Sequence, residues 1–207
     1  AARRRRPSVA ASVSAIALAG LVTFVVGLAL EPYLPHPVGA PLWATPAAVL
    51  AFVLATAVAE ILRVPLMHDG AVEALTFFEI VTVAAILLLE PRWALIAPLA
   101  GLAIVQLVTR KAPLKAAFNL GSYAVATTAA VVSYLIVCGT SPQFSVRGIA
   151  ALLVGMGVFA VINTVLLAVI LQAALGTSFR SVVTDFWALP VLMTLASISV
   201  GGVAVAV

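Results

Sequence analysis

Long apolar runs separated by short polar breaks make up almost the whole chain. A helix needs about 20 apolar residues to cross the hydrocarbon core of a bilayer. Runs that meet or approach this length cover residues 8–30, 43–62, 74–89, 93–108, 116–137, 149–175 and 186–207. They do not alternate between apolar and polar positions, which favours helices over a β-barrel. The pattern predicts about seven transmembrane helices.

Composition supports this fold class and excludes a soluble globule. Hydrophobic residues make up 64% of the chain and charged residues 9%, and the mean hydropathy is +1.25. A soluble domain carries about 25% charged residues, so water would have to cover mostly apolar side chains. We therefore expect an all-α, polytopic transmembrane helix bundle over residues 8–207, preceded by a basic cytoplasmic flank at residues 1–7.

The basic residues predict the orientation of the bundle. With the N-terminus in the cytoplasm, only Arg92 and Arg147 of the eleven Lys and Arg residues fall outside, in line with the excess of basic residues in cytoplasmic loops. The predicted cytoplasmic anchors are Arg3, Arg4, Arg5, Arg6, Arg110, Lys111 and Lys115. The basic run at the start indicates the lipid bilayer as a partner, through anionic headgroups, rather than nucleic acid.

The last run continues to the final residues, SISVGGVAVAV. Chains seldom stop inside an apolar run, so we expect the sequence to continue with at least one more helix, an eighth span. A soluble domain after that helix is also expected.

Glu79 is the sharpest candidate for a functional side chain. It follows Phe77 and Phe78 and precedes a long apolar run, so no basic residue lies near it in sequence. A buried carboxyl must be protonated or find a partner on another helix. Glu79 is therefore a candidate ligand-binding or switch residue, with structural hydrogen bonding as the alternative. Glu60 is a second candidate, although it shares a helix face with Arg63 and could form an ordinary ion pair at the inner surface.

Three amides are the remaining polar candidates: Asn119, Asn163 and Gln106. An amide in lipid typically bonds another helix, for about 0.6–2 kcal/mol. We expect Asn119, about one turn inside the helix that follows Pro113, to bond Asn163 or Gln106. These amides either hold the helices together or form the polar wall of a small-molecule pocket.

No catalytic or metal-binding pattern stands out in the sequence. Residues 155–160 read GMGVFA, which matches a dinucleotide motif but lies inside an apolar run with no strand before it. His68 and Asp69 are adjacent, with no second histidine nearby, and Cys138 is the single cysteine. The sequence therefore predicts no enzyme activity, no metal and no cofactor for the residues shown.

Three stretches resemble a known family. They read ALTFFEIVTVAAILLLEPRWALIAPLAGL at 74–102, PLKAAFNLGSYAVATTAAVV at 113–132 and FAVINTVLLAVILQAALGTSF at 159–179. They resemble the N-terminal multi-helix membrane region of bacterial cyclic-di-nucleotide signalling proteins, the actinobacterial ones in particular. In that family the region precedes a GGDEF, EAL or HD-GYP output domain, and no motif of such a domain appears in this sequence.

The resemblance implies a sensory or anchoring input domain in the bacterial plasma (inner) membrane. It would regulate a cytoplasmic synthase or hydrolase of cyclic-di-GMP that lies outside this sequence, in response to an unidentified small ligand. A small transporter or substrate-binding subunit is one alternative, with a pocket among Glu60, Glu79, Asn119 and Asn163. An accessory subunit of a larger membrane complex is another, and a homodimer or larger assembly is the expected protein partner.

Overall fold

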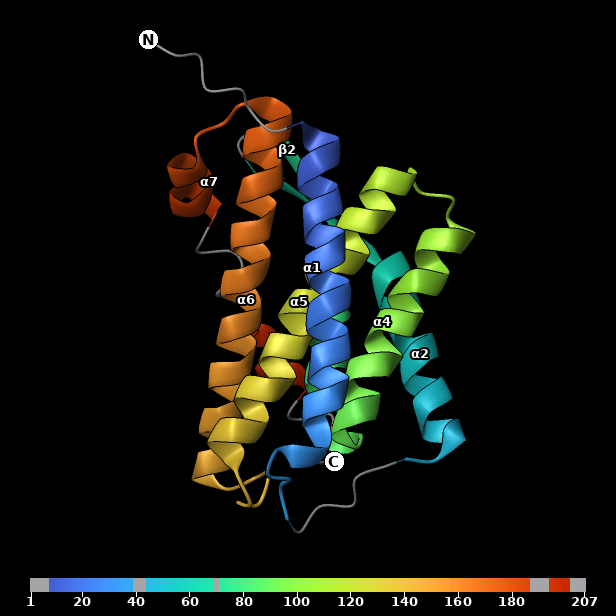
Figure 1. Ribbon diagram of the computed structural model, residues 1–207, viewed down its shortest axis with the longest axis vertical. Coiled ribbons are helices and arrows are strands. Elements are labelled where there is room, and N and C mark those ends of the chain that lie inside the picture. The colour runs from blue at the N-terminus through green and yellow to red at the C-terminus, as the bar shows by residue number, and fades with distance from the viewer. Residues whose placement is uncertain (1–7, 39–43, 69–70, 187–193, 202–207) are drawn as a thin grey trace.

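The computed structural model describes residues 8–38, 44–68, 71–186 and 194–201. For residues 63–68, 71–76, 183, 185 and 186 it describes the backbone alone. Helices form along the predicted apolar runs, where each segment satisfies its own backbone hydrogen bonds. They are α1 (Val9–Leu30), α2 (Pro46–Ile61), α3 (Phe78–Leu88), α4 (Pro91–Val108), α5 (Pro113–Cys138) and α6 (Val146–Leu175), with the short η1 (Glu31–Tyr33) and α7 (Phe179–Phe186). Residues 194–201 are also helical. The predicted helix bundle is confirmed (Figure 1).

Four helices in the described part of the chain are long and apolar enough to cross a membrane. They are α1 continued through η1, α4, α5 and α6, whereas α2 and α3 are apolar but shorter. The run predicted at 186–207 is described as a helix only at residues 194–201 beyond Phe186, and the basic flank at 1–7 lies outside the described residues. The count of seven spans therefore stays a prediction.

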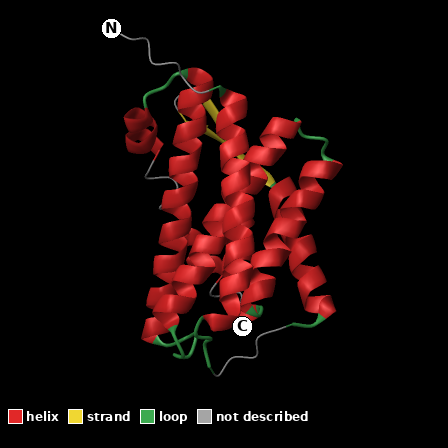
Figure 2. Cartoon of the chain, in the orientation of Figure 1, coloured by secondary structure: helices red, strands yellow, loops and turns green. Residues whose placement is uncertain are grey.

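The third predicted run is wrong at its start, because residues 74–76 are in a strand. Residues 63–76 form an antiparallel hairpin of β1 (Arg63–His68) and β2 (Ala71–Thr76), with Arg63 opposite Thr76 and His68 opposite Ala71. The sequence between the strands is Asp-Gly, a pair typical of two-residue hairpin turns. The hairpin lies at the upper end of the bundle in Figure 2 and makes α3 short.

Helix α5 lies between α1 and α6 and packs mainly against these two, while α4 packs mainly against α2. Gly20 and Gly121 bring α1 and α5 together, because a Cβ on Gly20 would lie 2.5 Å from the carbonyl oxygen of Gly121. A Cβ on Gly121 would lie 2.7 Å from the Cα of Ala17. Small residues allow this backbone contact between membrane helices.

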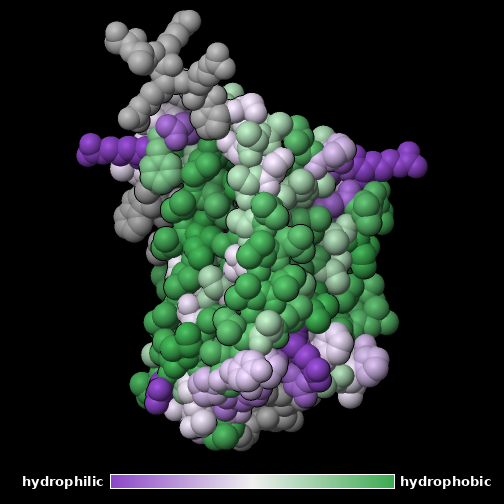
Figure 3. Space-filling view, viewed as in Figure 1, coloured by the Kyte–Doolittle hydropathy of each residue, from purple (hydrophilic) through white to green (hydrophobic). Residues whose placement is uncertain are grey.

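The core centres on α3, which buries Phe78, Thr82, Val83, Ala85, Ile86 and Leu87 of its eleven residues. Large apolar side chains on the outer faces of α1, α2 and α6 remain exposed, among them Leu18, Leu54 and Val161. Figure 3 shows hydrophobic residues over the middle of the molecule and hydrophilic residues at both ends. This distribution suits a bundle surrounded by lipid along its middle and by water at its ends.

Candidate functional site

A buried ion pair links the C-terminal end of α2 to the turn between α4 and α5. The Lys111 ammonium lies 3.1 Å from Oε1 of Glu60, and the two side chains are 13% and 5% exposed. Glu60 is in the last turn of α2, where its side chain faces inward rather than toward water. Lys111, predicted as an anchor at the headgroups, thus neutralises a buried carboxylate. The side chain of Arg63, the partner expected for Glu60, lies outside the described residues.

Gln106, one of the predicted candidates, lies on α4 close to this pair in sequence and is 3% exposed. The backbone carbonyl oxygen of Gln106 accepts a 3.2 Å hydrogen bond from the backbone N–H of Lys111. Neither atom of its side-chain amide has a hydrogen-bond partner in the described part of the chain. An unpaired buried amide costs about 1–3 kcal/mol, so Gln106 is available to a partner from outside the described residues.

Glu79 finds its partner on another segment, as its isolation in the sequence predicts. The Thr194 hydroxyl donates a hydrogen bond of 3.4 Å to Oε2 of Glu79 in the first turn of α3. Thr194 is 5% exposed and begins the helical residues 194–201. The same segment packs on α3 further along, because a Cβ on Gly201 would lie 2.7 Å from Val83 Cγ1. The Glu79–Thr194 contact therefore joins α3 to the last described helix.

Asn119 of α5 and Asn163 of α6 are both half-buried. One helical turn away, three rings pack together: the centroids of Phe78 and Tyr123 are 4.3 Å apart, and those of Phe78 and Phe159 are 6.3 Å apart. The expected hydrogen bonds from Asn119 to Asn163 or Gln106 are absent among the described residues. For Gln106 the reason is that α4 packs mainly on α2.

The other predicted anchors separate into described and undescribed residues. Arg3, Arg4, Arg5 and Arg6 lie outside the described residues. Arg110 and Lys115 are exposed beside the α4–α5 turn, at the end of the bundle that also carries α7 (Figure 1). Arg147 lies at the opposite end, where its Nε donates a 2.6 Å hydrogen bond to the carbonyl oxygen of Val137.

Several buried polar atoms that the sequence did not single out have no partner in the described part of the chain. Besides Gln106, they are Trp93 Nε1, Thr127 Oγ1, Thr128 Oγ1, the Tyr134 hydroxyl and Gln143 Oε1. Such atoms are rare inside proteins and each calls for an explanation. Their sequence positions carry no signal, because only the packing of α4, α5 and the loop after α5 makes them buried.

A cavity of about 400 Å³ opens between α1 and the end of α6. Ser12 of α1 and Gln172 of α6 line it, together with residues 176–178. Neither this cavity nor a smaller one at the other end of the bundle is lined by Glu60, Glu79, Asn119 or Asn163. A pocket formed by these four residues, as the transport alternative requires, thus has no support from the two cavities described.

Comparison with protein-family models places these features in a family. The model of MASE9 matches residues 12–206, which is nearly the whole chain. The chain belongs to the MASE9 family. MASE9 is a membrane-associated sensory domain family found in cyclic-di-GMP signalling proteins. This confirms the resemblance to the membrane region of such proteins, while the actinobacterial type stays a prediction. A search of curated proteins finds no match to this MASE9 chain.

Proposed function

We propose that this MASE9 domain is a transmembrane input domain that regulates a cytoplasmic output domain acting on cyclic-di-GMP. The family match carries the proposal, since MASE9 domains are found in cyclic-di-GMP signalling proteins. The buried polar contacts between helices support it, because a two-state switch needs contacts that differ between its states.

The Glu79–Thr194 hydrogen bond is the contact best suited to such a switch. It joins α3, the most buried helix, to the helical residues 194–201, which come last in the described chain. A weak, single hydrogen bond between membrane helices contributes about 0.6 kcal/mol, so a stimulus of modest energy can break it. Movement of residues 194–201 relative to α3 would then pass to whatever follows them.

The proposed orientation places the end with the α4–α5 turn and α7 in the cytoplasm. Arg110 and Lys115 at this end are exposed and suit contact with anionic headgroups. Arg92 and Arg147 lie at the opposite end with the α1–α2 and α5–α6 connections. This orientation puts the hairpin and the Glu60–Lys111 pair on the same side as the proposed output domain.

The test replaces Glu79 by glutamine in the full natural protein that carries this domain. Glutamine keeps the size of the side chain but removes its charge, so the contact with Thr194 weakens. We expect cyclic-di-GMP in cells to change by up to about threefold, which corresponds to the contact energy given above. Lys115→Gln, which removes an exposed charge near the same end, is the control. Unchanged cyclic-di-GMP at equal expression of Glu79→Gln would remove Glu79 from the switch.

A further inference from the structure

The lower end of the bundle contains a small cavity at the end of α3 opposite to Glu79. Its apolar walls are Ile86 of α3 and Leu89 directly after it, Pro91 and Ala94 of α4, and Val131 and Leu135 of α5. Pro37, from the loop after η1, also lines it. Three consecutive helices and the α1–α2 connection thus meet at one space.

Two polar side chains line the same cavity, and both are buried almost completely. Tyr134 is 2% exposed and Gln143 is 3% exposed. The Tyr134 hydroxyl has no hydrogen-bond partner in the described part of the chain. Oε1 of Gln143 also has no partner in the described part of the chain. A cavity with one hydroxyl and one amide oxygen left unpaired offers a molecule both a donor and an acceptor.

The loop between α5 and α6 holds Gln143 in this inward position. Ser145 caps α6 by accepting the Gly148 N–H at 3.1 Å and donates a 2.6 Å hydrogen bond to the carbonyl oxygen of Pro142. Gly148 lies directly against the backbone of Gln143, where a Cβ would collide with its carbonyl group. Gln143 is therefore buried by the fold of the loop and not by chance rotation of a surface side chain.

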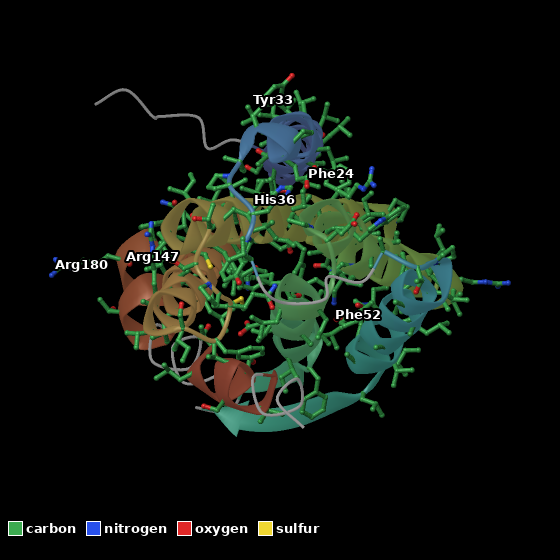
Figure 4. The ribbon with its side chains drawn as sticks, turned by 90° about the horizontal axis from the view of Figure 1, so that it is seen from below. Phe24, Tyr33, His36, Phe52, Arg147 and Arg180 are labelled. Atoms are coloured by element: carbon green, nitrogen blue, oxygen red, sulfur yellow. The ribbon has the colours of Figure 1, made fainter. Side chains whose placement is uncertain are left out.

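A second set of contacts holds the loop that carries Pro37. Nε2 of His36 lies 3.2 Å from Oε1 of Glu31 and 3.3 Å from its backbone carbonyl oxygen. Figure 4 views the molecule from this end: Tyr33 points away from the bundle, whereas His36 lies on the bundle side. The cavity thus has a defined edge on the α1 side.

Size and charge define what the cavity accepts. Its volume is about 10 Å³, on the measure that gives about 400 Å³ for the cavity between α1 and α6. That space holds about one water molecule. All nine lining residues are uncharged, and an apolar wall disfavours an ion.

We propose that this cavity is a binding site for one small, uncharged molecule that both donates and accepts hydrogen bonds. The molecule donates to Oε1 of Gln143 and bonds to the Tyr134 hydroxyl. Water is a molecule of this kind, and one water molecule has the size that the space admits. Binding at this site does not depend on the proposed signalling function, which is tested separately through cyclic-di-GMP.

A double-mutant cycle on the folding equilibrium constant, measured in detergent micelles, tests whether a molecule bridges the two side chains. Tyr134→Phe and Gln143→Met remove each polar group with little change of shape, and Tyr33→Phe, at an 85% exposed tyrosine, is the control. If a molecule bridges them, each substitution lowers the folding equilibrium constant about fivefold, and the double variant loses no more than one single variant. If the site is empty, each substitution removes an unsatisfied atom and raises that constant, which overturns the proposal.

Discussion

Glu60 and Glu79 each meet a partner from a distant part of the chain, whereas Tyr134 and Gln143 meet none among the described residues. The first two are carboxyl groups near the hairpin and the start of α3, and the other two are neutral groups beyond its end. A charged group that is buried without a partner costs more free energy than a neutral polar group that is buried without a partner. The fold therefore fixes the partners of its acidic groups and leaves the neutral site open to an exchangeable molecule.

The largest effect in this comparison is expected at the Glu60–Lys111 pair. Lys111→Met removes the ammonium 3.1 Å from Glu60 and should lower the free energy of unfolding by about 3–5 kcal/mol. Reversible unfolding in mixed micelles measures the change. Lys115→Met, at an exposed lysine of the same region, should change it by less than about 0.5 kcal/mol. Equal losses in the two variants would mean that the pair is not buried in the membrane-embedded protein.

A smaller effect on stability is expected at Gly121, where the backbones of α1 and α5 come into contact without any polar side chain. Gly121→Ala places a methyl group 2.7 Å from the backbone of Ala17 and should cost about 1–3 kcal/mol. Gly157→Ala is the matched control, since no atom lies within 4 Å of its added Cβ. It should be neutral or raise the free energy of unfolding by up to about 1 kcal/mol, because alanine favours a helix. The same unfolding assay decides, and a cost at Gly157 as large as at Gly121 would contradict the described crossing of α1 and α5.

Thr194→Val should have the smallest effect on stability. It removes one hydrogen bond to Glu79 and should lower the free energy of unfolding by about 0.6 kcal/mol. In the full natural protein Thr194→Val should nevertheless change cyclic-di-GMP in the same direction as Glu79→Gln, because both substitutions weaken the contact between residues 79 and 194. A large loss of stability, with cyclic-di-GMP unchanged, would make the contact structural rather than regulatory.

The sequence predicted the helices well because each apolar run determines its own backbone hydrogen bonds. It also predicted that Glu79, without a basic neighbour, is either protonated or paired with another helix, and its contact with Thr194 fits the second alternative. It did not predict the hairpin, although Asp-Gly before β2 is a usable turn signal.

The positions of single side chains were harder to predict from sequence. Thr194 as the partner of Glu79, and Lys111 as that of Glu60, depend on how distant helices pack. Tyr134 looks like any aromatic residue in an apolar helix, and Gln143 looks like a polar loop residue. Only the tertiary structure brings these two side chains to one cavity. The expected hydrogen bond from Asn119 to Gln106 was wrong for the same reason, since sequence spacing does not reveal which helix faces which.

The most direct test of the proposed switch measures cyclic-di-GMP in cells that carry the full natural protein with Glu79→Gln, Thr194→Val or both. If the two residues act through one contact, each substitution changes cyclic-di-GMP in the same direction, and the double variant changes it no further than one single variant. Independent, multiplicative changes from the two substitutions, or no change from either, would contradict this account.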